Sequence, residues 1–206
     1  TKHWKGAQQK VEARNFDIRK TLLKFDNVLS DQRQVIFSER TKVMDNKEIF
    51  SYSDSFLNEI INNLLNNKKE YLINPKGNEF KGKLISVSGK SFNEQEIGEL
   101  TKLEDKDFPS KIINKFNKIR NERVKLLGEQ QAQEIEKRIF LQTIDLSWKS
   151  HIQYLEQLRQ VIGLRSYGQR DPLIEYKKEA FNLFENLLNK LKTDLITILI
   201  NLTIIE

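Results

Sequence analysis

Apolar positions repeat at helical spacing along residues 5 to 44, where the sequence begins its first long element. One stripe consists of Ala7, Val11, Ile18, Leu22, Phe25, Leu29, Ile36 and Val43. Spacings of three, four and their sums place such side chains on one face of a helix. Neither proline nor glycine occurs between Ala7 and Asn74, which also favours long helices.

A second apolar set lies off this stripe on the same predicted helix, namely Phe16, Leu23, Val28, Val35 and Phe37. A surface helix usually has a single apolar face. One interpretation is therefore a strut that docks onto other domains through several faces. The other is a helix whose charged side is solvated and paired along its length. The pattern leaves both open.

Residues 45 to 127 are less regular and predict an insertion that is mostly helical. Ser53 is expected to cap a helix that runs to about Leu72. Residues 83–88 are predicted to form a short strand, which Gly89 would end.

Two more helix starts are predicted within this segment. Asn93 and Glu96 have the spacing of a capping box, which would open a short helix to about Leu103. Pro109 is placed near the start of a further helix, because the first turn tolerates proline.

Residues 129 to 163 and 172 to 202 predict two long helices joined by a short loop. Asp171 is a good N-cap, and Pro172 occupies the favoured first helical position. Such a pair forms an antiparallel hairpin, so the sequence predicts an all-α fold. The stripe expected on the first of these helices consists of Ile135, Ile139, Ile144, Trp148, Ile152, Leu155 and either Val161 or Ile162.

The tip of the predicted hairpin carries an aromatic residue between two arginines. Tyr167 lies between Arg165 and Arg170 and supplies a large apolar surface with a hydroxyl, which suits contact with an extended chain. Folding of Tyr167 back onto its own helices is the alternative. Gly163 and Gly168 suit positive φ at the helix end and in the turn.

Candidates for metal binding are few, and we expect no metal site. Trp148 and His151 share a helix face; Trp148 is expected in the core, and His151 as a partnered or surface residue rather than a ligand. The acidic residues Glu104, Asp105 and Asp107 lack the spacing of an EF-hand loop, so a solvated loop is preferred.

Composition narrows the function classes further. The 206 residues are 38% hydrophobic and 31% charged, with a net charge of +6, so a real core is possible and an acidic partner is compatible. The absence of cysteine excludes a disulfide framework, a zinc ribbon and thiol catalysis. No apolar run reaches the roughly 18 residues of a membrane span. No G-x-x-x-x-G-K-[ST] phosphate loop occurs, so the chain is not expected to be an enzyme by itself.

Three segments carry a longer pattern: residues 14–23 (RNFDIRKTLL) with 31–33 (DQR), residues 141–145 (LQTID) with Trp148, and residues 158–177. Together they closely resemble the SecA family, the ATP-driven motors of bacterial preprotein translocation. The resemblance implies a scaffold helix over 1–44, a divergent helical wing over 45–128, and a continued scaffold with a two-helix finger over 129–206, its tip at 163–172.

The resemblance also implies roles for individual residues. The fingertip residues that contact polypeptide or channel would be Tyr167, Arg165, Arg170 and Gln169. The finger residues that restrain the ATPase would be Trp148, Asp145 and His151. The residues that dock onto the motor domains would be Arg14, Asn15, Phe16, Asp17, Arg19, Asp26 and Arg33.

The same resemblance implies partners and a location. The chain would couple ATP hydrolysis in absent motor domains to the movement of unfolded preprotein into the SecYEG channel. It would hold no cofactor itself, whereas the parent would bind ATP and Mg. Acidic lipids are further expected partners, the isolated piece is expected to self-associate, and the location would be the bacterial cytoplasm and the cytoplasmic face of the inner membrane.

Two other function classes compete with this interpretation. A basic helical nucleic-acid-binding domain would fit a pI of 9.3, but basic residues are interspersed with acidic ones, so no nucleic acid is expected. A free-standing coiled-coil scaffold would dimerise through the first helix, yet Arg14 and Gln32 lie on its stripe without sustained core heptads.

Overall fold

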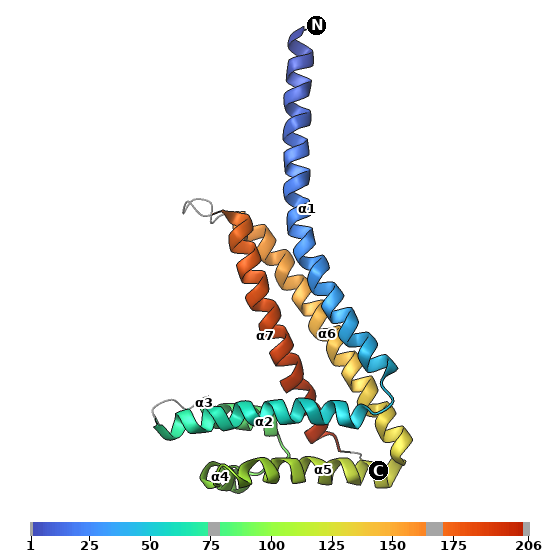
Figure 1. The fold of residues 1–206 in the computed structure, drawn as a ribbon, viewed down its shortest axis with the longest axis vertical. Helices are drawn as coiled ribbons and strands as arrows, with labels where there is room; N and C mark the ends of the chain where they lie inside the picture. Colours follow the sequence, from blue (N-terminus) through green and yellow to red (C-terminus); the bar gives the residue numbers. More distant parts are fainter. Residues whose placement is uncertain (1, 74–78, 164–170, 204–206) are drawn as a thin grey trace. The chain divides into compact units, whose positions relative to one another are not determined.

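The computed structural model describes the backbone of residues 2–73, 79–163 and 171–203 (Figure 1), and their side chains except those of residues 2–11, 17–19, 21 and 79. Within these ranges the regular structure is helical and contains no strand, which confirms the all-α prediction. The helices are α1 (Lys2–Asp45), α2 (Ile49–Ile73), α3 (Glu79–Ser88), α4 (Glu94–Lys102), α5 (Asp107–Leu127), α6 (Glu129–Ile162) and α7 (Pro172–Asn201).

Helix ends marked by strong local signals lie where the sequence predicts them. The side chain of Asn93 accepts a hydrogen bond from the Glu96 backbone N–H, and the Glu96 side chain accepts from the Asn93 backbone N–H, which completes the capping box of α4. At the start of α7, Asp171 Oδ1 accepts a 2.8 Å hydrogen bond from the Leu173 N–H. These side chains satisfy backbone donors that the first turn of a helix leaves unpaired.

The strand predicted over residues 83–88 is wrong, because these residues belong to α3. Phe80, Leu84 and Val87 are buried on one face of this helix, at the spacing of four and three that a helix requires. The predicted segment began at Lys83 and so left out Phe80, which is the residue that makes the helical spacing evident.

The N-cap predicted at Ser53 is also wrong. Helix α2 begins at Ile49, one turn earlier, and Ser53 lies inside it with no exposed surface. Asn46 precedes the helix, and its Oδ1 accepts a 2.8 Å hydrogen bond from the Glu48 N–H. The serine hydroxyl instead serves a buried network that is described below.

Of the two glycines predicted to have positive φ, Gly163 and Gly168, only Gly163 is described, and it does not have it. Among the described glycines, Gly89 (φ 54°) and Gly128 (φ 83°) have it, whereas Gly163 does not. The end of α6 tightens into a 3₁₀ turn at Gly163, which needs no left-handed residue. Gly168 lies outside the described residues.

The chain divides into two compact units. The hairpin unit comprises Thr1–Arg40 and Leu146–Leu187, and the insertion unit comprises Thr41–Asp145 and Leu188–Glu206. Helices α1, α6 and α7 each contribute a segment to both units.

The core of the hairpin unit lies between its segments of α1, α6 and α7. The α6 and α7 segments run antiparallel beside one another (Figure 1), as the sequence predicts for a hairpin. Its buried cluster consists of Leu155, Leu158, Ile162, Tyr176 and Ala180, against which Phe25, Val28, Leu29 and Leu183 pack.

The core of the insertion unit is rich in aromatic side chains. The rings of Tyr52, Phe56 and Phe140 lie with centroids 5.0 to 5.7 Å apart, and the ring of Phe80 lies 6.1 Å from that of Phe108.

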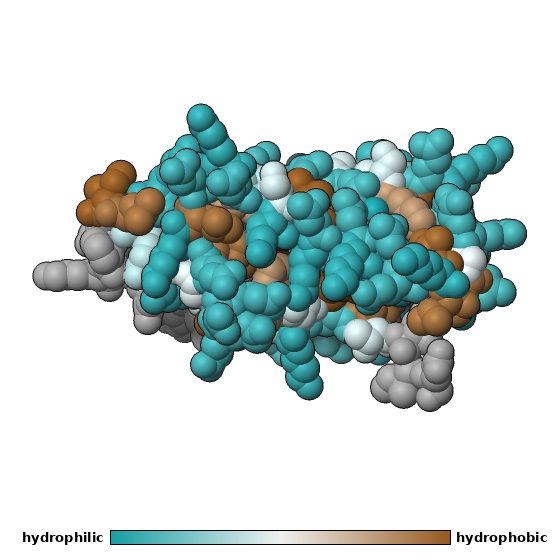
Figure 2. Space-filling view, turned by 90° about the horizontal axis from the view of Figure 1, so that it is seen from below, coloured by the Kyte–Doolittle hydropathy of each residue, from teal (hydrophilic) through white to brown (hydrophobic). Residues whose placement is uncertain are grey.

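Figure 2 shows one face of the molecule on which hydrophilic side chains predominate and apolar ones form small separate patches.

The apolar stripe predicted on α6 is only partly right. Ile144, Trp148 and Leu155 are buried, but Ile135, Ile139 and Ile152 are half-buried. In this part of α6 the buried positions are Ala132, Glu136 and Phe140. The buried face is therefore shifted by one residue relative to the isoleucines and includes a carboxylate.

Candidate functional site on the helical hairpin

A buried glutamine of α1 joins both helices of the hairpin. Gln32 Nε2 donates a 3.0 Å hydrogen bond to the backbone oxygen of Ala180 in α7. Gln32 Oε1 lies 2.7 Å from His151 Nε2 in α6. Since an amide oxygen can only accept, the histidine donates from Nε2, which assigns its proton to that nitrogen. Gln32 and His151 are 7% and 3% exposed, so water cannot easily replace these bonds.

His151 is also enclosed by aromatic rings. Its ring centroid lies 5.5 Å from that of Trp148 and 5.6 Å from that of Phe184. This burial lowers the pKa of His151, because a charged imidazolium is poorly solvated there. The histidine is therefore neutral at pH 7 and acts as a partnered core residue, and Trp148 is in the core as predicted.

Nearer the tip, α1 contacts the hairpin through a ring pair and an ion pair. The Phe25 and Tyr176 rings meet edge-on with centroids 4.8 Å apart, an arrangement that aromatic quadrupoles favour. Arg159 Nη1 lies 2.9 Å from Asp26 Oδ1, and its guanidinium lies 6.0 Å from the Phe25 ring centroid. Burial raises the pKa of Tyr176, so its hydroxyl stays protonated.

Large apolar side chains also lie on the exposed faces of the hairpin unit. On α1, Phe16, Leu23 and Phe37 are 63%, 62% and 53% exposed. On the hairpin, Tyr154 and Phe181 are 61% and 58% exposed. Exposed apolar patches of this kind are typical of interaction surfaces.

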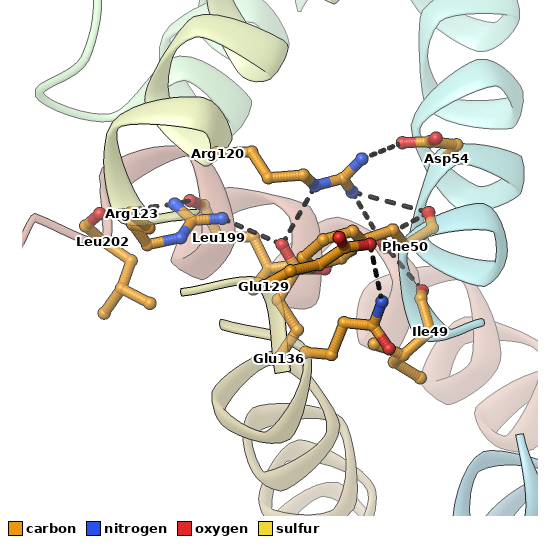
Figure 3. A network of polar contacts seen from close by, with 11 residues as sticks. Ile49, Phe50, Asp54, Arg120, Arg123, Glu129, Glu136, Leu199 and Leu202 are labelled. Atoms are coloured by element: carbon orange, nitrogen blue, oxygen red, sulfur yellow. Dashed lines mark hydrogen bonds and ion pairs between the residues drawn. The ribbon is translucent and has the colours of Figure 1, made fainter. Parts of the chain in front are cut away.

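The insertion unit contains a second buried polar site, centred on a carboxylate with no exposed surface (Figure 3). Glu136 of α6 accepts hydrogen bonds from Ser53 Oγ at 3.0 Å, Arg120 Nε at 3.1 Å and Arg123 Nη2 at 2.9 Å. Arg120 extends the network to Asp54 Oδ1 at 2.7 Å. The network therefore joins α2, α5 and α6.

Arg123 carries the same network to the end of α7. Its Nη1 donates to the backbone oxygens of Leu199 at 2.8 Å and Leu202 at 3.3 Å. The last carbonyls of a helix lack intrahelical partners and carry partial negative charge. The last turn of α7 has no basic residue of its own, so the α5 arginine supplies the cation. Burial lowers the pKa of Arg123, while the Glu136 carboxylate opposes this shift.

Of the acidic residues Glu104, Asp105 and Asp107, Asp105 forms an ion pair with a lysine. Asp105 Oδ1 lies 3.2 Å from the Nζ of Lys68, a buried lysine that also donates to the Leu103 backbone oxygen. Across the described residues, no group of three or more His, Asp or Glu side chains is arranged to hold a metal ion. No helix in the described ranges has the length and apolarity needed to cross a membrane.

The structure brings together only some of the residues singled out by the sequence. Trp148 and His151 lie in one cluster, and Asp26 faces Arg159. Arg14, Asn15, Phe16, Arg33 and Asp145 are exposed. The side chains of Asp17 and Arg19 are outside the described set, and so is the whole fingertip set, Tyr167, Arg165, Arg170 and Gln169. The functional roles of these residues remain predictions.

Sequence reasoning missed the residues that form the polar bridges. Gln32 stood out only as a polar residue on an apolar stripe. The buried faces of α5 and α6 include three charged residues, Arg120, Arg123 and Glu136. The signal in the sequence was a charged residue at a position where the helical period requires an apolar one.

Comparison with known proteins identifies the family of this sequence. The SecA Wing and Scaffold domain family matches residues 1–203. The protein translocase subunit SecA of Pelagibacter ubique is 65% identical over 200 residues, which cover 97% of this chain and 23% of that protein. The subunit SecA of Finegoldia magna is 34% identical over 209 residues, 100% of this chain and 23% of that protein.

The subunit SecA 1 of Rhodopseudomonas palustris is 41% identical over 189 residues, 90% of this chain and 20% of that protein. The chain thus spans less than a quarter of the length of these relatives. The described helices are consistent with an all-α wing and scaffold domain, and the chain belongs to the SecA Wing and Scaffold domain family.

Proposed function

We propose that this chain is the mechanical part of a SecA-type translocase, in which it couples ATP hydrolysis by separate motor domains to movement of unfolded preprotein into the SecYEG channel. The observation that carries the proposal is the family match over residues 1–203, together with the attachment of the hairpin to α1. A hairpin that inserts into a channel needs a stable attachment to the rest of the protein, and the hydrogen bonds of Gln32 attach it to α1.

The exposed apolar residues of α1 support a docking role for this helix. Phe16, Leu23 and Phe37 would contact the motor domains of the same protein, with the polar residues of 14–33 beside them. The full docking set in the proposal is Arg14, Asn15, Phe16, Asp17, Arg19, Asp26 and Arg33. ATP and Mg would bind in the motor domains, and this chain would hold neither.

The hairpin would have two roles along its length. Tyr167, with Arg165, Gln169 and Arg170, would contact the moving polypeptide or the channel. The finger segment with Asp145, Trp148 and His151 would restrain ATP hydrolysis until the channel engages. Action at the channel would locate the protein in the bacterial cytoplasm and on the cytoplasmic face of the inner membrane, near acidic lipids.

The first test replaces the matching segment of the Pelagibacter ubique SecA with this chain. We expect the chimera to move a preprotein into SecYEG vesicles, and Tyr167→Ala to reduce the rate by more than about tenfold, as truncation of an aromatic anchor often does. Gln157→Ala is the control, because Gln157 is an exposed polar residue of α6 in the same unit. Unchanged transport in Tyr167→Ala would refute the fingertip assignment.

The second test addresses the restraint of ATP hydrolysis. The isolated chain is titrated into the motor domains of the same relative while hydrolysis is measured. Binding with a lower rate is expected, and Phe16→Ser should weaken it because an exposed apolar contact is lost. A chain that neither binds nor changes the rate would contradict the docking proposal.

A further inference from the structure

Both units contain a bridge of the same kind between α6 and α7. In the hairpin unit, Gln32 of α1 links the His151 side chain of α6 to the Ala180 backbone oxygen of α7. In the insertion unit, Arg123 of α5 links the Glu136 side chain of α6 to the Leu199 backbone oxygen of α7. Each time, a side chain from a third helix joins a polar side chain of α6 to the main chain of α7.

All six partners are inaccessible or nearly so. Gln32, Arg123, Glu136 and His151 are at most 7% exposed, and Ala180 and Leu199 are fully buried. Among the described residues, no buried side-chain nitrogen or oxygen lacks a hydrogen-bond partner. A bridge that broke inside either unit would therefore leave buried donors and acceptors unpaired, which costs more than the bridge contributes.

Apolar packing alone fixes the axial position of two helices poorly. The ridges of a helix repeat every three to four residues, so a slide of one turn, about 5.4 Å, brings apolar rows opposite apolar rows again. A hydrogen bond is far less tolerant, because it is lost when its atoms move apart by about 1 Å. The α7 acceptors are backbone oxygens that the helix holds rigidly, so each bridge breaks when α7 slides by a fraction of a turn. A slide of a full turn would offer the next backbone oxygen, and the bridge opposes the positions between the two.

We propose that Gln32 and Arg123 set the axial register of α7 against α6, each in its own unit. Gln32 acts as a positioning residue through the scaffold helix, and Arg123 does so through the insertion. The insertion thereby has a mechanical role, because it holds the helix that returns from the hairpin tip. The consequence for transport rests on the proposed function, whereas the register itself does not.

The register is measured by electron spin resonance distances between labels on α6 and α7. The chain has no cysteine, so labels can be placed without removing native thiols. Leu146 and Ile174, which are 58% and 63% exposed, serve in the hairpin unit. Glu134 and Lys190, both exposed, serve in the insertion unit. Dilution in excess unlabelled chain removes distances between molecules.

Each bridge is then removed by a variant of similar size. In Gln32→Leu we expect the distance between labels at 146 and 174 to shift or to broaden by more than about 1 Å, the displacement at which the wild-type hydrogen bond is lost. In Arg123→Met the distance between labels at 134 and 190 should change in the same way. Gln34→Leu, at an exposed position of α1, is the matched control and should leave both distances unchanged.

Milder variants separate register from folding. Gln32→Glu in its ionised form keeps the acceptor for His151 but has no donor for the Ala180 oxygen, so it is measured at a pH at which the carboxyl is ionised. Arg123→Lys keeps the charge but lacks the planar guanidinium with its paired donors. Both should broaden the distance in their own unit while circular dichroism shows native helix content. Distances identical to wild type in variants that retain native helix content would overturn the proposal.

Transport in the chimeric SecA separates the two proposals. A shifted register with reduced transport supports both. A shifted register with unchanged transport supports the register proposal and contradicts its proposed role in translocation. An unchanged register in Gln32→Leu overturns the register proposal whatever the transport rate.

Discussion

Removal of the Glu136 side chain gives the most direct test of the buried network. Glu136→Ala deletes the acceptor of three hydrogen bonds, from Ser53, Arg120 and Arg123. Arg120 keeps Asp54 as a counter-ion, but Arg123, whose side chain is 3% exposed, forms no ion pair with another carboxylate among the described residues. The variant therefore leaves a buried guanidinium charge that is compensated only by the partial negative charge of the Leu199 and Leu202 backbone oxygens.

The magnitude follows from this loss. Removing one partner of a buried ion pair costs about 3–5 kcal/mol, because the other charge remains desolvated. Glu136→Gln retains an acceptor oxygen without the charge, and we expect a smaller cost, about 1.5–3 kcal/mol, as for hydrogen bonds that involve a charged group. The two variants should rank in this order if the charge on Glu136 stabilises the site.

The assay combines urea unfolding with hydrogen exchange. Circular dichroism gives the free energy of unfolding, and exchange of α5 amides shows whether the loss falls in the insertion unit. Glu134→Ala, an exposed neighbour on α6, should stay within about 0.5 kcal/mol of wild type. A cost below about 1 kcal/mol for Glu136→Ala would refute the reasoning that this carboxylate compensates the buried arginines.

Three further predictions concern single residues. Burial lowers the pKa of His151 below its unfolded value of about 6.5, so the folded state binds fewer protons than the unfolded state. Stability should therefore fall as the pH drops below about 6.5. Thermal unfolding across pH should show a less steep fall in His151→Gln. Asn93→Ala should cost about 1 kcal/mol of unfolding free energy and Asn93→Asp almost none, since only alanine removes the cap of α4. Gly89→Ala should destabilise the chain more than Gly128→Ala in urea unfolding. Both glycines have positive φ, which strains an alanine. Only at Gly89 would the new Cβ also lie 2.4 Å from a side-chain atom of Asn201.

Long periodic patterns made the fold predictable. Helices α1, α6 and α7 run for 44, 34 and 30 residues, so their stripes repeat many times and chance matches average out. Pro172 and the Asn93 capping box mark helix starts through local chemistry, which needs no tertiary information. These are the features that one sequence carries by itself.

Short elements and polar partners were predictable only in part. Residues 83–88 are too few to show a helical period, and the buried Phe80 outside that window, with Leu84 and Val87, restores it. Gln32 and His151 are 119 residues apart in the sequence, and Gln32 and Ala180 are 148 apart. A polar residue on an apolar stripe shows that a partner is needed, but only the packed structure shows which one.

The two bridges and the apolar core stabilise the fold through forces of different range and direction. Burial of Leu155, Leu158 and Tyr176 drives the hairpin together, yet this attraction depends on area and hardly on axial position. The hydrogen bonds of Gln32 and Arg123 add little net energy and fix position instead, because they are lost when α7 slides by about 1 Å. A helix pair that must transmit force along its axis needs this second property, since resistance to sliding is what apolar packing supplies least.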